Sequence, residues 1–264
     1  MSASRNLTPS PGSAPAKLDL RDYTSARVAL DRTGSSITTR RALEFSLAHA
    51  QARDAVHATL AVPSLLAALR ERNLAALPVR SAAPNRTEYL RRPDLGRQLN
   101  AASAALLQSA TANLQPATSI TLILADGLSA LATERHALPV VDALLPLLKI
   151  GEPDATWRLT PIVIAEQARV ALADQIGQAF HADATVILIG ERPGLSSPDS
   201  LGAYITWSPR PGRTDAERNC VSNIRTEGLD YTTAAARIAR TLTQGRRLGL
   251  TGVALRESDT GLLP

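Results

Sequence analysis

Short continuous apolar runs alternate with amphipathic stretches of helical period over residues 86–264. The apolar runs predict four strands, at residues 119–124, 159–164, 185–189 and 203–207, and the longer stretches between them predict helices. Strands that alternate with helices are typical of a mainly parallel sheet that helices cover on both faces. We therefore predict an α/β domain over residues 86–264.

The first third of the chain shows a different pattern. Residues 1–17 are rich in Ser, Pro, Ala and Gly and have no amphipathic period, which predicts a disordered tail. Residues 18–85 show helical spacing: Leu43 and Leu47 fall on one face, and Pro63 suits the first turn of a second helix. We predict a small helical domain over residues 18–85.

The composition limits the class of protein. The chain is 44% hydrophobic but only 3% aromatic, so aliphatic side chains must fill the core. No stretch approaches ~20 uninterrupted apolar residues, which argues against a membrane span. A single cysteine allows no internal disulfide, and the first residues lack the apolar region of a secretory signal. We expect a cytoplasmic protein without a membrane partner.

The charge pattern does not favour nucleic acid, although the net charge is +5 and the pI is about 10.0. The basic residues are almost all arginines, and they are scattered among acidic residues without a run of five. Scattered arginines suit protein interfaces that carry carboxylates. A non-catalytic protein that binds an acidic partner is therefore one alternative.

The exits of two predicted strands are candidate ligand contacts, because open α/β sheets bind ligands at the carboxyl ends of their strands. The strand at 185–189 runs into residues 190–194, G-E-R-P-G, whose glycines allow the backbone to approach a ligand. The alternative for Glu191 is an exposed ion pair with Arg192. Asp126 follows the strand at 119–124, where it would either meet a ligand or cap the next helix.

Other kinds of site have weak support. No G-x-G-x-x-G follows the strand at 119–124 and no P-loop motif occurs, so a stand-alone nucleotide-binding module is disfavoured but stays an alternative. Cys220 could be a nucleophile, a ligand contact or a packed thiol. The four histidines form no Cys–His signature with it, so a buried small residue is the default. We predict neither a catalytic residue nor a metal site.

Several longer motifs occur in order between about residues 20 and 255. They are R-P-D-L-G-R at 92–97, A-D-G-L-S at 125–129, R-V-A-L-A-D-Q-I-G at 169–177, G-E-R-P-G-L at 190–195, the segment 204–210, and C-V-S-N-I at 220–224. In this combination the chain resembles the small (light) subunit of ethanolamine ammonia-lyase.

The resemblance implies more than the residues show by themselves. It implies a helical N-terminal part, a Rossmann-like cobalamin-binding part, and a larger barrel subunit as partner in a hetero-oligomer of several large–small pairs. Adenosylcobalamin would lie between the subunits, with Val170, Glu191 and Cys220 as contacts from this chain. The enzyme would be a carbon–nitrogen lyase, inactive without the large subunit, that converts ethanolamine to acetaldehyde and ammonia by radical chemistry. Packaging in a bacterial microcompartment stays open, because the predicted tail lacks an amphipathic stripe.

Overall fold

The computed structural model describes residues 32–111, 118–150, 152 and 157–255, together with positions 20, 23, 28 and 30. The chain divides into two compact units, Met1–Ala48 and His49–Pro264. The predicted tail at residues 1–17 lies outside the described residues, and the predicted domain boundary at residue 85 stays a prediction.

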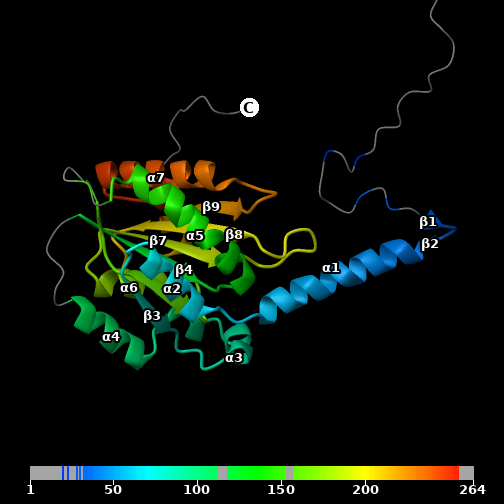
Figure 1. The fold of residues 1–264 in the computed structure, drawn as a ribbon, viewed down its shortest axis with the longest axis horizontal. Coiled ribbons are helices and arrows are strands. Elements are labelled where there is room, and N and C mark those ends of the chain that lie inside the picture. The colour runs from blue at the N-terminus through cyan, green and yellow to red at the C-terminus, as the bar shows by residue number, and fades with distance from the viewer. Residues whose placement is uncertain are drawn as a thin grey trace, which may run out of the picture. The chain divides into compact units, whose positions relative to one another are not determined.

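The first unit contains a short hairpin and the start of a long helix. Strands β1 (Arg32–Thr33) and β2 (Ser36–Ile37) pair antiparallel, and helix α1 (Thr39–His57) follows and continues into the second unit (Figure 1). Among the described residues, the predicted apolar face of α1 is exposed: Leu43 is 65% and Leu47 is 62% exposed.

The second unit is built on one sheet, whose strand order among the described residues is β3-β6-β4-β7-β8-β9, with β5 paired to β4. The strands are β3 (Ala76–Arg80), β4 (Ser119–Ala125), β5 (Arg158–Leu159), β6 (Ile162–Glu166), β7 (Ala184–Gly190), β8 (Leu201–Trp207) and β9 (Asn219–Ile224). The strands β3, β6, β4, β5 and β7 run parallel, whereas β8 runs antiparallel to both of its neighbours. The α/β class is confirmed, and the sheet is mixed.

The strands differ from the prediction at three places. Residues 76–80, inside the segment predicted to be helical, form the edge strand β3. Pro78 has no backbone N–H to donate, and an edge strand tolerates this because only one of its sides is paired. The segment predicted as one strand at 159–164 forms two strands, β5 and β6, which both pair with β4. The pairing with β4 is interrupted between them, at Pro161. The strand β9 was missed because its sequence, N-C-V-S-N-I, is polar on one face.

Helices cover both faces of the sheet (Figure 1). They are α2 (Val62–Glu71), α3 (Arg86–Arg91), α4 (Ala101–Thr111), α5 (Ala130–Leu147), α6 (Leu172–Ala179) and α7 (Tyr231–Leu248). The helices α2, α5 and α7 pack on one face, and α4 and α6 pack on the other. At the start of α4, the side chain of Asn100 accepts a hydrogen bond from the Ser103 backbone N–H at 2.8 Å.

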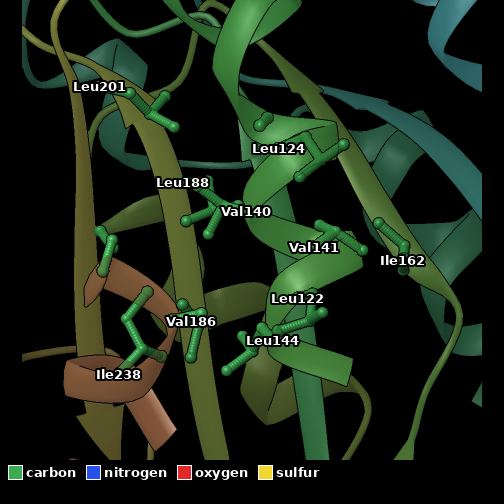
Figure 2. Close-up of a cluster of buried hydrophobic side chains, with 14 of the residues drawn as sticks. Leu122, Leu124, Val140, Val141, Leu144, Ile162, Val186, Leu188, Leu201 and Ile238 are labelled. Atoms are coloured by element: carbon green, nitrogen blue, oxygen red, sulfur yellow. The ribbon is translucent and has the colours of Figure 1, made fainter. Parts of the chain in front are cut away.

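The larger core lies between α5 and the sheet. Figure 2 shows Val140, Val141 and Leu144 of α5 pointing toward side chains of β4, β6 and β7. Because helices cover both faces of the central strands, β7 is buried at every position and β4 at all but its first. This explains why both strands read as continuous apolar runs in the sequence.

Candidate functional site

The carboxyl end of β4 is tied to the loop that follows β6. Asp126 is 1% exposed, and its carboxylate accepts hydrogen bonds from the backbone N–H groups of Gln167 at 2.8 Å and Ala168 at 3.0 Å. Arg86 contacts the same carboxylate at 3.4 Å. The prediction that Asp126 caps the next helix is wrong, because Ser129 caps α5. Asp126 holds two loops together instead.

A pair of arginines reinforces this connection. The guanidinium groups of Arg86 and Arg169 lie over the ring of Tyr89, at 4.7 and 4.3 Å from its centre. The Tyr89 hydroxyl donates to the Ala168 carbonyl at 2.9 Å. Burial raises the pKa of Asp126 to about 6, although the two backbone donors and Arg86 oppose the shift. The loop that precedes α6 is therefore held at several points.

The crevice between the carboxyl ends of β4 and β7 is filled by the chain itself. Leu128 donates its N–H to the Gly190 carbonyl at 2.9 Å, and a Cβ atom on Gly190 would lie 2.0 Å from the Ser129 carbonyl oxygen. Gly190 is thus required for packing against the start of α5. Since α/β proteins bind nucleotides in such a crevice, the structure gives no support to a stand-alone nucleotide-binding module.

Glu191 comes directly after β7, and its side chain crosses to β8 and β9. Its carboxylate accepts from the Ser200 hydroxyl at 2.5 Å and from the Asn223 backbone N–H at 3.3 Å. The alternative of an ion pair with Arg192 is not found among the described residues. The carboxylate lies over Gly202, where a Cβ atom would come within 2.9 Å of Glu191 Oε1.

The strands β8 and β9 have one covered face and one open face. Leu201, Ala203 and Ile205 of β8 pack in the core with α7, as does Val221 of β9. The alternate residues point the other way, and Cys220 on this side is exposed. The default expectation of a buried thiol is therefore wrong, because within the described residues no helix covers this face of β9. We call it the open face, defined by Gly202, Tyr204, Cys220 and Ser222.

Cys220 stands directly opposite Tyr204 in the β8–β9 ladder. Loss of solvent around the thiol raises the pKa of Cys220, the nearby charge of Glu191 adds to the rise, and a hydrogen bond with Tyr204 partly opposes it. Loss of solvent and the same thiol raise the pKa of Tyr204. Because a protonated thiol is a poor nucleophile, this environment suits a contact rather than covalent chemistry.

A cleft of about 460 Å³ opens beside Val170, at the start of α6. We call it the arginine cleft. It is lined by Pro93, Arg97, Arg169, Val170, Ala171, Tyr204, Arg213, Thr214 and Asp215. Tyr204 belongs both to this cleft and to the open face. The structure therefore brings the three residues singled out from the sequence to one continuous surface, with Val170 in the cleft and Glu191 and Cys220 on the open face.

A family model described as "Ethanolamine ammonia-lyase light chain (EutC)" matches residues 15–256. The chain belongs to this family. Proteins named ethanolamine ammonia-lyase small subunit are similar over nearly their whole length. The chain is 53% identical to that of Bradyrhizobium diazoefficiens over 94% of this chain and 92% of the relative. It is 51% identical to that of Azotobacter vinelandii over 90% and 87%, and 50% identical to that of Pseudomonas paraeruginosa over 91% and 86%.

Members of the ethanolamine ammonia-lyase light-chain family are subunits of a carbon–nitrogen lyase, so this chain is a subunit of an enzyme. Within the part of the chain that the structure describes, no group of three or more His, Cys, Asp or Glu side chains is placed to hold a metal ion. None of the helices described is both long and apolar enough to cross a membrane.

Sequence reasoning missed several residues of the site, although it had noted the segments that contain them. Arg97, Arg169 and Tyr204 lie in the motifs at 92–97, 169–177 and 204–210, but as parts of a resemblance rather than as candidate contacts. Arg213 carried no signal. The first and the last of these residues, Arg97 and Arg213, are more than a hundred positions apart in the sequence, and only the tertiary structure brings them together.

Proposed function

We propose that this chain is the small subunit of an adenosylcobalamin-dependent ethanolamine ammonia-lyase. Val170, Glu191 and Cys220 contact the cofactor at the interface with the large subunit. The enzyme converts ethanolamine to acetaldehyde and ammonia, and the bound cofactor supplies the radical chemistry. The observation that supports the site is that these three residues, from three separate segments, share one accessible surface with Tyr204 between them.

The residues on this surface suit the chemistry of adenosylcobalamin. The corrin ring carries amide side chains, and the Glu191 carboxylate is an acceptor held by Ser200 and Asn223. Val170 offers an apolar contact, and the protonated thiol of Cys220 offers a small polarizable one. Gly202 has no side chain, which leaves the space that the Glu191 carboxylate occupies over β8.

The size of the cleft supports a shared site. Pockets of about 300–1,000 Å³ enclose drug-sized ligands. A cleft of about 460 Å³ beside an open sheet face can therefore hold only part of a corrinoid. The remainder must be covered by another polypeptide, which fits a subunit that is inactive alone.

The large subunit is the partner that we propose, in a hetero-oligomer of several large–small pairs. Among its described residues, the first unit exposes five large aliphatic side chains. They are Leu20, Leu30, Ile37, Leu43 and Leu47, which are 50%, 37%, 50%, 65% and 62% exposed in the single chain. Grouped exposed apolar side chains are typical of protein interfaces. The proposal includes a Rossmann-like cobalamin-binding part, a helical N-terminal domain and a cytoplasmic location.

The test is a titration of the complex, co-expressed with its large subunit, with adenosylcobalamin, followed by visible absorption. We expect Glu191→Ala to weaken cofactor binding about 10-fold, as loss of a charged hydrogen-bond acceptor does. The circular dichroism and co-purification should not change. Glu227→Ala is the matched control, because this substitution removes the same charge at a side chain that is 82% exposed. Wild-type affinity in Glu191→Ala, or a wild-type complex that takes up no corrinoid, would contradict the proposal.

A further inference from the structure

We propose that the arginine cleft binds the phosphodiester of the cofactor's nucleotide tail, through Arg97 and Arg169. This inference rests on the proposed function. It assigns a role to two arginines of the cleft that also contains Val170, in addition to the contacts proposed for Val170, Glu191 and Cys220.

The charges around the cleft are not balanced. Three arginines line it against one carboxylate, that of Asp215. Arg213 is already engaged, because its guanidinium contacts Glu217 and donates to the Ser208 carbonyl at 3.1 Å. Arg97 and Arg169 have no carboxylate partner within the described residues. Two positive charges on the wall of one cleft favour an anionic ligand.

Asp215 does not neutralise these two arginines. Its side chain is 97% exposed, and it lies 3.6 Å from the buried guanidinium of Arg218, a different arginine behind the cleft. Arg218 in turn is bound on both sides of its fork by Asp174. The carboxylates near the cleft are therefore directed at Arg213 and Arg218.

Arg169 is held in place before any ligand arrives. Its guanidinium stacks on the Tyr89 ring, and one terminal nitrogen donates to the Tyr89 carbonyl at 3.2 Å. Its Nε atom is buried and has no hydrogen-bond acceptor among the described residues. A guanidinium group that is already held in place loses little entropy when an anion binds.

Gly96 links the two arginines. The Arg169 backbone N–H donates to the Gly96 carbonyl at 2.8 Å, and a Cβ atom on Gly96 would lie 2.8 Å from Arg169 Cγ. Arg97 follows Gly96 directly, so the two basic residues reach the cleft from adjoining backbone segments. Guanidinium groups arranged in this way can bind a phosphate with paired N–H donors.

The neighbouring elements favour a phosphate ester that belongs to a larger ligand. Val170 and Ala171 precede the first turn of α6, a helix of eight residues whose N-terminus carries partial positive charge. On its other side the cleft is continuous, through Tyr204, with the open face. A ligand that places an anion in the cleft and amide groups over β8 and β9 satisfies both regions, and adenosylcobalamin has both groups.

The experiment compares two corrinoids on the complex with the large subunit. Adenosylcobinamide has the same corrin ring and adenosyl group as adenosylcobalamin but lacks the phosphate and the nucleotide. We expect Arg97→Ala to raise the dissociation constant about 10-fold for adenosylcobalamin and less than about 2-fold for adenosylcobinamide. Arg169→Lys, which keeps the charge but loses the fork, should show the same selectivity. Absorption and fluorescence quenching measure both constants without activity.

The control variant is Arg158→Ala, which removes an exposed arginine at the amino end of the sheet, where β5 pairs with Ser119 of β4. It should bind both corrinoids like wild type. Because Arg97 is exposed and makes no ion pair within the described residues, Arg97→Ala should fold normally, and circular dichroism checks this.

The outcomes separate the two proposals. Equal losses for both corrinoids, or none for either, would overturn the phosphate assignment while leaving the cofactor proposal intact. A wild-type complex that binds neither corrinoid would overturn both. A titration with AMP addresses free nucleotides as the source of the phosphate. AMP binding that requires Arg97, without any corrinoid binding, would also overturn the assignment to the cofactor tail.

Discussion

The carboxylate of Glu191 occupies the space that a side chain on Gly202 would need. A Cβ atom at Gly202 would lie 2.9 Å from Glu191 Oε1 and 3.2 Å from its Cγ. Ser200 and Asn223 hold the other carboxylate oxygen. The orientation of Glu191 is thus set by the two strands β8 and β9, and not by its own loop alone.

Gly202→Ala should displace Glu191 without unfolding the protein. The obstructing atom belongs to the end of a flexible side chain, so we expect a loss of less than about 1 kcal/mol in the free energy of unfolding. Cofactor affinity of the complex should fall about 3- to 10-fold, because the acceptor leaves its position. Gly194→Ala makes the same change on the loop after Glu191 and meets only Ser197. Affinities that match in the two variants would show that the position of Glu191 does not matter.

Because of Asp126, the free energy of unfolding should decrease as the pH rises from 4 to 6. Burial raises its pKa from 3.8 to about 6. In this range the folded protein still holds the proton that the unfolded chain has released, so the stability contributed by this group is complete below pH 4 and is lost as the pH rises through 6. The pKa difference corresponds to about 3 kcal/mol.

Asp126→Asn removes this titration and isolates its effect. The free energy of unfolding of wild type minus that of the variant, from urea unfolding, should decrease between pH 4 and pH 7 by up to about 3 kcal/mol. The asparagine leaves one of the two backbone donors, Gln167 or Ala168, without an acceptor, which costs about 1–3 kcal/mol at every pH. A difference that is constant with pH would contradict the raised pKa.

The buried pair of Asp174 and Arg218 should be costly to break from one side. Both side chains are almost fully buried, and the guanidinium binds the two carboxylate oxygens at 2.8 and 2.7 Å. Arg218→Met should lower the free energy of unfolding by about 3–5 kcal/mol, because it leaves a buried charge unpaired. The double variant with Asp174→Leu should recover part of this loss in urea unfolding.

The exposed pair of Arg92 and Asp94 provides the comparison for this measurement. Arg92→Met should leave the urea midpoint unchanged, because solvent already screens this pair. The result to compare is the change in the free energy of unfolding relative to wild type. If Arg218→Met and the double variant both change it no more than Arg92→Met does, the buried pair is not coupled.

Cys220 should react slowly with alkylating reagents and become protected by the cofactor. The raised pKa leaves little thiolate at pH 8, so the rate with iodoacetamide should still be rising above pH 9. Tyr204→Phe removes the hydrogen bond that lowers the Cys220 pKa and should slow the reaction at pH 8. Mass spectrometry reads the result directly, since this is the only cysteine. Rapid labelling of the cofactor-loaded complex would contradict the proposed contact.

The sequence by itself determined the α/β class and most of the central strands. The apolar runs of β4 and β7 are readable because helices bury both faces of these strands, which leaves no polar positions. It did not reveal β3 or β9, because each is a short edge strand whose residues follow no simple apolar pattern. Local patterns report on burial, and edge strands are only partly buried.

The sequence also supplied the candidates Val170, Glu191 and Cys220, through the motifs that contain them. Only the tertiary structure decided that Gly190 serves packing and that Asp126 joins two loops. It also decided that Tyr204 connects the cleft with the open face. The physical reason is that β8 runs antiparallel between β7 and β9, so that Tyr204 of β8 stands opposite Cys220 of β9. Pairings between distant segments set this arrangement, and they leave no trace in the spacing of residues along the chain.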